Sequence, residues 1–393
     1  MRPIINPGLR RLWRDHATLQ LGVDAGHAIV LSGLGAAASG VLDLLDGTRT
    51  RAQLLAETTA AGRELITLLE AEGVLDDASA DPAGSTSLPA LEHGRLGPDR
   101  ASLSLLAAGP AGARVALRRR QAAIVRVRGA GRVGAHVATL LAAAGVGSVI
   151  VDDAGVARPS DAAPGGLRLD DIGRPRSVAA GRAIARACRP AVSRRRAATP
   201  VRPDLVVITP TGPPVADIDE AADLEQARLP HLIAGVRETT GIIGPMVLPG
   251  RSACLGCQHR HRTDRDPAWP LLVAQLTRRP EVGIDPCDVT LAALVAAVTA
   301  MQALALLDAA LGANGDRRGG PQRSPEDSRA ASVTDGTAAA GPTMFPTAAL
   351  PASVGGTLEL ALPSWRIRRR SWPVHPDCSC AAAAGIPKPG GPG

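Results

Sequence analysis

The sequence predicts an α/β protein with a mainly parallel β-sheet, preceded by a small domain of strands and helices. Two patterns lead to this prediction. From Ala122 onward, short apolar strands alternate with helical segments, which is typical of βαβ units in a parallel sheet. Before that point, residues 1–80 combine a hairpin pattern with leucines at helical spacing. A chain of 393 residues is long enough for two or three domains with their own cores.

The N-terminal part, residues 1–80, has the composition of a winged-helix-like domain. Residues 17–31 read as two short strands around Asp24. Leucines then recur at helical spacing up to Leu75, which predicts two or three short helices. A strand pair followed by three helices is the content of a small winged-helix domain.

The remaining segments divide by composition. Residues 81–117 are expected to be a linker, because Asp, Ser, Pro and Gly dominate its first part. Residues 118–311 carry the strand–helix alternation. Residues 312–350 lack periodicity and are expected to form a flexible insertion. Residues 351–382 predict one or two strands that lead into a cysteine pair, and residues 383–393 predict a disordered tail.

A glycine motif opens the strand–helix series. Gly129, Gly131 and Gly134 follow an apolar strand and begin a helix, which is the context of a nucleotide-binding G-x-G-x-x-G turn. Glycines there let the backbone approach a phosphate at the helix N-terminus. Asp152 and Asp153 end the next strand, where a carboxylate can hold ribose hydroxyls. The alternative is a glycine-rich turn that only lets strand and helix pack closely.

Four cysteines form two pairs with metal-ligand spacing. Cys254 and Cys257 make a C-x-x-C pair, and Cys378 and Cys380 a C-x-C pair. Both spacings let two thiolates meet one tetrahedral Zn²⁺, and a metal between the pairs would close a long loop. The alternatives are free buried cysteines or a redox pair. Substitute ligands would be His375, His259 and His261, whereas Cys188 and Cys287 have no partner cysteine nearby in the sequence.

Composition excludes some functions. The single lysine, Lys388, lies in the tail, so no lysine is available for Schiff-base or P-loop chemistry in the folded body. With no tyrosine and one phenylalanine, the chain lacks an aromatic platform for stacking bases. The net charge is +7. Arginine triplets at 118–120, 194–196 and 368–370 could bind nucleic acid or an acidic peptide, or be solvated charge.

Two observations favour a cytoplasmic protein with no membrane partner. The N-terminal residues lack the apolar stretch of a signal peptide. Residues Val289–Leu311 are apolar, but their alanines, Thr and Gln favour a buried helix over a membrane span. Six cysteines in a reducing compartment favour metal binding over disulfides.

The order of these features resembles the ThiF/MoeB family, the bacterial relatives of ubiquitin-activating enzymes. The resemblance covers about residues 120–310 and 354–382, and it rests on GAGRVG, VIVDD, GVRETTGIIGPMVLPGRSACLGC and the split cysteine pairs. It implies a Rossmann-like ThiF fold, ATP and Mg²⁺ as cofactors, adenylation of the C-terminal carboxylate of a small protein or peptide, a structural zinc and a homodimer.

A closer resemblance is to the ThiF-like proteins of thiazole/oxazole-modified peptide (bacteriocin) biosynthesis. It rests on CLGCQHRHRTDRDPAWPLLVAQL and on HPDCSC at residues 375–380. It implies that residues 1–80 recognise the leader of a ribosomally made precursor peptide, and that the chain serves a YcaO-type cyclodehydratase. We expect the leader to add as a strand to the hairpin 17–31, with apolar pockets near Leu42, Leu45 and Leu65. In the alternative, the hairpin edge is covered by the rest of the protein.

The sequence departs from the active ThiF pattern at three places. The Asn and Arg expected after the ribose carboxylate are replaced by ARPSDAAPGG. The expected phosphate-binding lysine is replaced by Arg176, with Arg174 as a second candidate, and Arg176 is also the one candidate catalytic residue. The expected Asp that binds the metal is missing from DLVVITPTGP, where the nearest acids are Asp217 and Asp219.

These departures remove groups that neutralise charge on the phosphates. They favour a peptide-binding protein with a degenerate ATP site over an active adenylyltransferase. A DNA-binding regulator is the third hypothesis, and nucleic acid is not the expected partner, because acids interrupt the arginines of the winged-helix segment.

Overall fold

The computed structural model describes residues 1–26, 28–79, 90–107, 109–188, 202–277, 284–309, 330–332 and 350–383. The chain forms two compact units. Unit 1 comprises Met1–Arg118 and Leu311–Ala349, and unit 2 comprises Arg119–Ala310 and Leu350–Gly393. The expected flexible insertion, apart from residues 330–332 and Leu350, and the tail from residue 384 onward lie outside the described residues.

Unit 1 contains an antiparallel sheet that includes the predicted hairpin. Leu19 pairs with Leu31 and Leu21 with Ile29, so the two expected strands are confirmed. A further strand precedes them and pairs with the first of the two. The sheet strands in chain order are β2 (Arg11–Trp13), β3 (Leu19–Leu21) and β4 (Ile29–Ser32).

Three short helices follow this sheet, as the leucine spacing predicts. They are α1 (Ala36–Leu44), α2 (Arg51–Glu57) and α3 (Ala60–Ala71). Thr50 begins α2 with a capping box, in which its hydroxyl accepts from the Gln53 backbone N–H. The chain then returns to pair β5 (Leu75–Asp77) with β1 (Pro3–Ile5), two strands too short to give a periodic signal.

The helices of unit 1 bury their leucines against the sheet. Leu42, Leu45 and Leu65 are fully buried in this core, together with Leu19, Leu21 and Leu31 of the sheet. The prediction that these three helix leucines line pockets for a peptide is therefore wrong. Their apolar surface is already removed from water by the protein itself, which contributes about 1.5–3 kcal/mol for each side chain.

The outer edge of β4 is paired by a distant segment of the same chain. Strand β11 (Ala330–Ser332) runs parallel to β4, with Ala330 opposite Val30 and Ser332 opposite Ser32. The sheet order is therefore β11-β4-β3-β2. The two strands lie at opposite ends of the sequence, so the pairing is a tertiary contact that no local pattern predicts.

The linker expected over residues 81–117 is corrected from residue 90 onward, where three helices form. They are α4 (Ala90–Arg95), α5 (Gly97–Leu106) and α6 (Gly112–Ala122). Leu96, Leu103, Ala113, Ala116 and Leu117 meet in a small core of their own. The helical spacing of these few apolar residues is hidden among many Asp, Ser, Gly and Pro residues, so composition alone was misleading.

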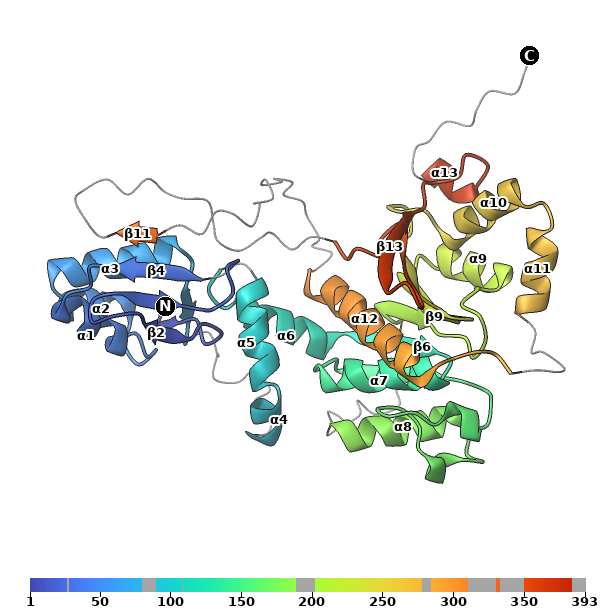
Figure 1. The fold of residues 1–393 in the computed structure, drawn as a ribbon, viewed down its shortest axis with the longest axis horizontal. Helices are drawn as coiled ribbons and strands as arrows, with labels where there is room; N and C mark the ends of the chain where they lie inside the picture. The colour runs from blue at the N-terminus through green and yellow to red at the C-terminus, as the bar shows by residue number, and fades with distance from the viewer. Residues whose placement is uncertain are drawn as a thin grey trace, which may run out of the picture. The chain divides into compact units, whose positions relative to one another are not determined.

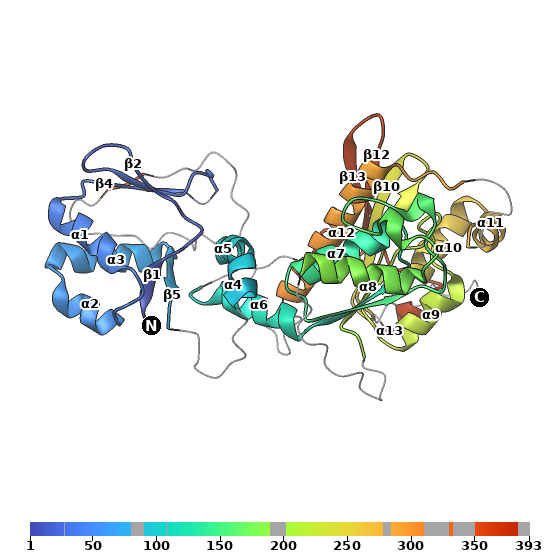
Figure 2. The ribbon, with the colours of Figure 1, turned by 90° about the horizontal axis from the view of Figure 1, so that it is seen from below.

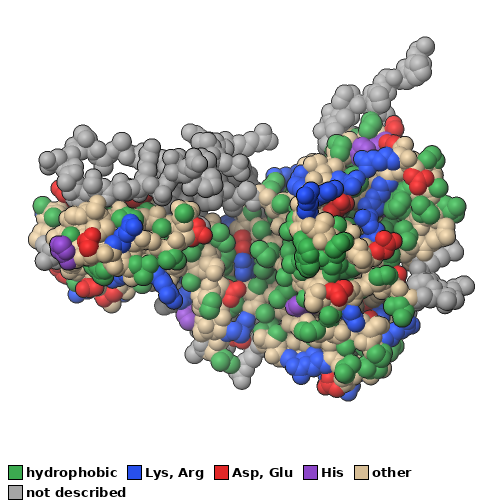
Figure 3. Space-filling view, in the orientation of Figure 1, with side chains coloured by type: hydrophobic (Ala, Val, Ile, Leu, Met, Phe, Trp, Pro, Cys, Tyr) green, Lys and Arg blue, Asp and Glu red, His purple; other side chains and the backbone are tan. Residues whose placement is uncertain are grey.

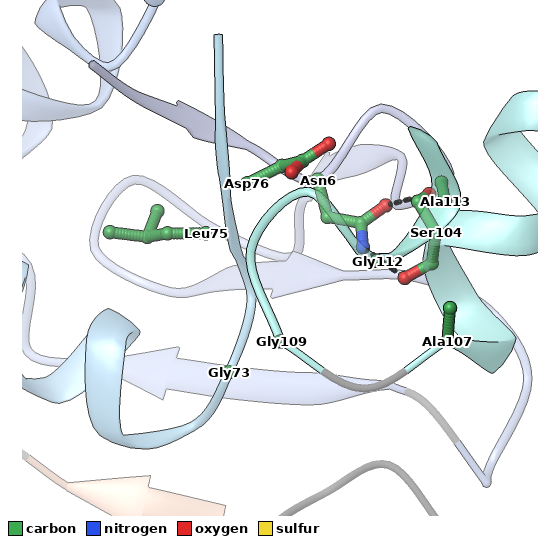
Figure 4. A pocket seen from close by; sticks show the side chains of 9 residues that line it. All are labelled: Asn6, Gly73, Leu75, Asp76, Ser104, Ala107, Gly109, Gly112 and Ala113. Atoms are coloured by element: carbon green, nitrogen blue, oxygen red, sulfur yellow. Dashed lines mark hydrogen bonds between the residues drawn. The ribbon is translucent and has the colours of Figure 1, made fainter. Parts of the chain in front are cut away.

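A buried polar contact ties α5 to β1 (Figure 4). The Asn6 amide donates to the Ser104 carbonyl at 2.7 Å, and the Ser104 hydroxyl donates to Asn6 Oδ1 at 2.6 Å. A cavity of about 10 Å³ lies beside this pair. That volume is at the lower limit for one water molecule, so the cavity is a packing feature and no ligand site.

Unit 2 is built on one seven-stranded sheet with the order β13-β12-β10-β9-β8-β6-β7 (Figures 1 and 2). Four consecutive strands are parallel, and three antiparallel strands complete the sheet. The expected α/β fold with a Rossmann-like parallel core is confirmed. The strands are β6 (Ile124–Arg128), β7 (Ser148–Asp152), β8 (Leu205–Ile208), β9 (His231–Arg237), β10 (Thr240–Val247), β12 (Gly356–Ala361) and β13 (Arg366–Ser371).

Helices cover both faces of this sheet. Successive residues of β8 point to opposite faces: Leu205 and Val207 pack in one core, and Val206 and Ile208 pack in another. The first core lies under α7 (Arg132–Ala143) and α12 (Val289–Asp308). The second face carries α9 (Ile218–Gln226) and α10 (Leu255–Arg265). The other helices are α8 (Arg176–Ala187), α11 (Trp269–Leu276) and α13 (Ser379–Ala383).

Helix α12 is the apolar segment that raised the question of a membrane. It is the one helix among the described residues that is long and apolar enough to cross a bilayer. Leu291, Val295, Thr299 and Ala303 lie on its buried face, which contacts α7, β9 and β10. The prediction of a buried helix is confirmed.

An ion pair fixes the C-terminal end of α12. Arg120 is buried, and its Nε and Nη2 donate to the two carboxylate oxygens of Asp308 at 2.7 and 2.6 Å. Its Nη1 also donates to the carbonyl of Ala144 at 3.3 Å, at the end of α7. One guanidinium therefore joins the residues before β6 to two helices of the same sheet face.

Removing the carboxylate should destabilise unit 2. Asp308→Ala leaves the Arg120 guanidinium buried without its counter-charge, which costs about 3–5 kcal/mol in comparable sites. We expect urea denaturation to show a loss of about 3 kcal/mol in the free energy of unfolding. Asp170→Ala is the control, because Asp170 is exposed. Equal stability of the two variants would contradict a structural role for the ion pair.

Candidate functional site

The four predicted cysteine ligands meet in one buried cluster in unit 2. The Sγ atom of Cys254 lies 3.8 Å from that of Cys257 and 3.5 Å from that of Cys378. The Sγ atoms of Cys257 and Cys380 are 3.2 Å apart. All four ligand atoms lie within 4.8 Å of one another. A tetrahedral Zn²⁺ with Zn–S bonds of about 2.3 Å requires sulfur–sulfur distances of about 3.8 Å, so the arrangement fits this metal.

Two distant segments supply the sulfurs. Cys254 and Cys257 stand at the N-terminal end of α10, and Cys378 and Cys380 at the start of α13. Gly256 passes close to two sulfurs, since a Cβ at this position would lie 3.3 Å from the Cys254 Sγ and 3.5 Å from the Cys378 Sγ. The cluster therefore joins α10 to the chain that follows β13.

The protonation of the thiols also fits a bound cation. Hydrogen bonds with Cys257 and Cys378, and then burial, raise the pKa of Cys254 far above its ordinary value. Hydrogen bonds from Cys254 and Cys257 lower the pKa of Cys378, whereas burial raises the pKa of Cys380 to about 12. Four buried thiols of the protein alone cannot all ionise, because the first thiolate opposes the others. A divalent cation provides the charge that four thiolates need.

The three histidines considered as substitute ligands lie outside the four-cysteine cluster. The backbone N–H of His375 donates to the Cys257 Sγ at 3.3 Å, so this residue supports a ligand. The His375 Nε2 lies 2.9 Å from the Asp264 carboxylate. His259 accepts from the indole N–H of Trp269, and burial lowers its pKa to about 4. His261 lies against the Pro373 carbonyl.

The glycine motif forms the turn between β6 and α7. Gly129 has a φ of +98°, which a residue with a Cβ rarely adopts. A Cβ on Gly129 would overlap the Thr209 carbonyl, and a Cβ on Gly134 would overlap the Gly129 carbonyl. A Cβ on Gly131 would lie 3.1 Å from the Thr211 side chain. Close packing between β6, β8 and α7 therefore accounts for all three glycines without a nucleotide.

The protein's own carboxylate already binds the glycine turn. Asp153 accepts hydrogen bonds from the backbone N–H groups of Ala130 at 2.8 Å and Gly155 at 2.7 Å. Ala130 lies beside the N-terminus of α7, where free N–H groups would otherwise attract a phosphate. Asp152 is exposed and pairs with Arg126 at 3.2 Å. The two predicted ribose-binding carboxylates therefore have different environments.

Arg176, the candidate phosphate ligand, is buried and paired with carboxylates. Its Nε and Nη2 donate to the two oxygens of Asp161 at 2.8 and 3.0 Å, and its Nη1 lies 3.7 Å from Asp153. The Nη1 has no hydrogen-bond partner among the described residues. Two carboxylates next to one guanidinium leave a net negative charge, which does not attract a phosphate.

A cleft of about 340 Å³ opens beside the glycine turn, at the carboxyl ends of β6 and β8. Crossovers leave β6 in opposite directions here, to β7 on one side and to β8 on the other. Such points are where open α/β sheets bind ligands. The cleft is lined by Arg128, Gly129, Ile208, Pro210, Thr211, Gly212, Pro213, Val215, Asp217, Glu220, Gln275, Leu276, Thr277 and Asp285.

The charge of this cleft is negative. Its one arginine, Arg128, is paired with Glu220 at 2.7 Å. Two further carboxylates remain, those of Asp217, which caps α9, and Asp285. Asp219, the other acid noted in the sequence, does not line the cleft, and neither does Arg174. A nucleoside triphosphate entering this cleft would meet repulsion from the protein.

Sequence patterns do not identify several residues of this region. Asp161, Glu220 and Asp285 carry no periodic or motif signal, and their roles come from contacts over long sequence separations. The two unpaired cysteines lie elsewhere. Cys188 is buried at the end of α8 and Cys287 is half-buried near Arg132, whose Nη1 donates to the Cys287 carbonyl at 2.7 Å.

Comparison with protein families places part of the chain. The ThiF family model matches residues 104–209, a span that contains the glycine turn, Asp153 and Arg176. No curated protein sequence matches the chain. The predicted resemblance to the ThiF/MoeB-like family is therefore confirmed over the matched part.

Solved structures extend the likeness to nearly the whole chain. Escherichia coli MccB bound to ATP has a TM-score of 0.61 and 13% identity, with 97% of this chain and 100% of MccB covered. The microcin C7 biosynthetic enzyme MccB in complex with N-formylated MccA has a TM-score of 0.63 and 14% identity, with 97% and 99% covered. PaaA has a TM-score of 0.59 and 16% identity, with 93% and 98% covered. At these identities the likeness establishes the fold.

The cysteine cluster predicts one zinc per chain. Elemental analysis of the purified protein should give about one Zn²⁺ per chain, because four thiolates fill a tetrahedral site. Cys254→Ser should lose the metal and unfold at a lower urea concentration, since metal binding here contributes to folding.

Cys287→Ser is the matched control, because it removes a thiol outside the cluster. It should keep its zinc. Full zinc retention by Cys254→Ser would rule out this metal centre.

Proposed function

We propose that this chain is a ThiF-like protein of ribosomal-peptide maturation, of the bacteriocin (thiazole/oxazole) type. In this proposal it binds a precursor peptide through unit 1 and serves a YcaO-type cyclodehydratase in the cytoplasm, and its own ATP site is degenerate. The observation that carries the peptide-binding part is the edge of β4, which accepts an extended segment as an additional strand.

The geometry of β4 supports strand addition by a peptide. Its inner residues, Ile29 and Leu31, are buried in the core of unit 1, so the strand is held rigidly. Its outer edge pairs with β11 over three residues. A strand edge that binds one extended segment offers the same backbone donors and acceptors to another. MccB, which shares the fold, has been crystallised with MccA, and this supports a peptide as the ligand.

The state of the glycine turn supports a degenerate ATP site. Asp153 occupies the Ala130 N–H, and Asp161 holds the guanidinium that would replace the family lysine. Thr209 replaces an acidic metal ligand, and its hydroxyl donates to the Gly129 carbonyl at 2.9 Å. The adjoining cleft is acidic. Phosphoryl and adenylyl transfer require groups that neutralise negative charge, and here they are paired or absent among the described residues.

The second candidate function is an active adenylyltransferase. The ThiF match over residues 104–209 and the ATP complex of MccB favour it. In that case Arg176 would have to leave Asp161 to reach a phosphate. The two functions differ in a single measurable reaction, the exchange of pyrophosphate into ATP.

The degenerate site predicts that the isolated chain does not exchange pyrophosphate into ATP when a candidate precursor peptide is present. The reason is the neutralised Arg176 and the acidic cleft. Arg176→Lys, which restores the residue type of the family, should not create the activity, because Asp161 and Asp153 remain. Robust exchange by the unmodified chain that is lost in Arg176→Lys would favour the adenylyltransferase instead.

The β4 edge predicts competition between β11 and the leader peptide. Ala331→Pro removes a backbone donor from β11 and should weaken its pairing with β4. Because one backbone hydrogen bond contributes about 1 kcal/mol net, the full chain should bind the leader about fivefold more tightly. The measurement is a fluorescence titration with the labelled leader of a precursor peptide encoded beside this gene.

Ala339→Pro, a proline outside β11, is the control and should leave the affinity unchanged. The core part of the same peptide, without its leader, should bind poorly to every variant. Equal leader affinities for the wild type and Ala331→Pro would argue against β4 as the peptide-binding edge.

A further inference from the structure

A group of arginines gathers around two tryptophans of unit 2. The Arg262 guanidinium carbon lies 4.6 Å from the ring centroid of Trp269 and 5.6 Å from that of Trp372. Arg265 and Arg370 approach the Trp372 ring at 5.8 and 5.9 Å. We call Arg262, Arg265, Arg370 and the neighbouring Arg237 the arginine cluster. Its members come from α10, β13 and the end of β9, so only the tertiary fold brings them together.

The tryptophans hold this cluster in place. The Trp372 indole N–H donates to the Thr357 hydroxyl at 2.8 Å, and Trp372 is buried. Trp269 donates to the His259 ring at 3.1 Å. Both rings are therefore fixed by hydrogen bonds, and a guanidinium over the face of a fixed ring is stabilised by the cation–π interaction.

The arginine cluster has too few negative partners. Among the described residues, Glu359 is the one carboxylate in its midst, and it pairs with Arg370 at 3.3 Å. No carboxylate in the described part of the chain lies within ion-pair distance of Arg237, Arg262 or Arg265. Arg262 is half-buried, and burial, followed by the charges of Arg237 and Arg370, lowers its pKa to about 10. It stays charged at neutral pH in surroundings that favour an anion beside it.

Strand β13 extends this positive surface along an open sheet edge. Arg366, Arg368 and Arg370 alternate along it and therefore share one face. The strand is the last in the seven-stranded sheet, and all six of its residues are exposed. Basic side chains gather over β13 in the space-filling view (Figure 3). On the opposite face of the strand, Ile367 is exposed as well.

We propose that β13 and the arginine cluster bind an acidic, extended peptide segment of a partner protein. The backbone of this segment adds as a strand to the outer edge of β13. Every second side chain of the added strand then faces the arginines, so alternating Asp or Glu residues form charge-assisted hydrogen bonds with them. Ile367 contacts the side chains between these acids. This surface is separate from β4, and the inference does not depend on the proposed function.

Self-pairing of β13 and simple protection of a sheet edge account less well for these arginines. A second copy of this chain would bring Arg366, Arg368 and Arg370 against the same arginines when β13 pairs with itself, which is unfavourable. Charges that merely protect a sheet edge from aggregation would be confined to β13. Arg262 lies on α10, half-buried between two tryptophans, and contributes nothing to such protection.

The test is a binding titration on the full chain with a short labelled peptide in which glutamate and valine alternate. This peptide should bind, its affinity should fall with added salt, and the version with glutamine in place of glutamate should bind about tenfold more weakly or worse. Arg368→Glu, at a fully exposed position, should weaken binding by about tenfold or more, and Arg262→Gln by about tenfold.

Arg260→Glu is the matched control, because Arg260 is exposed on α10 outside the cluster, and it should bind as the wild type does. Unchanged zinc content in every variant checks that the fold is kept. Equal affinity for the glutamate and glutamine peptides, or no effect of Arg368→Glu, would overturn the proposal. Tighter, equally arginine-dependent binding of a DNA duplex would also overturn it, because the partner would then be a nucleic acid.

Discussion

The four buried thiols near the C-terminus are the constraint on which the second unit depends. Two of them begin α10 and the other two follow β13, and their sulfur atoms lie within 4.8 Å of one another. Antiparallel strands at the edge of a sheet have few neighbours, and β13 has only β12 among the described strands. A divalent cation bound to both pairs would anchor the chain after β13 to α10. The same anchoring holds Trp372 beside Arg262, so the arginine cluster exists only when the two segments meet.

The glycine turn illustrates how a nucleotide-binding fold can be retained while its site is filled from within. A carboxylate on the backbone N–H groups of the turn is a chemical substitute for a phosphate, and Asp153 takes that place. The arginine that would meet a phosphate is neutralised in the same way by Asp161. Both contacts keep the turn and α8 in place without a ligand. Similarity in fold to MccB therefore says little about activity here, because the difference is in a few buried side chains.

The two units offer different surfaces for extended chains. In unit 1 the β4 edge is paired by β11, while in unit 2 the β13 edge is free among the described residues and carries arginines. A sheet edge binds any backbone, so charge and side-chain pockets must supply the selectivity. The leucines of α1 and α3 supply none, since they fill the core of unit 1.

The sequence by itself determined the parts that depend on local spacing. The alternation from β6 to β9, the hairpin of β3 and β4, the buried helix α12 and the identity of the four clustered cysteines all follow from short-range patterns of apolar residues, glycines and thiols. The tertiary structure alone decided the rest. Helices α4 to α6 were hidden by a loop-like composition, and the pairing of β11 with β4, the capture of Arg176 by Asp161, the acidic cleft and the arginine cluster join residues from separate segments. Such contacts are set by the packing of whole elements, and no local pattern encodes which distant charge a side chain will meet.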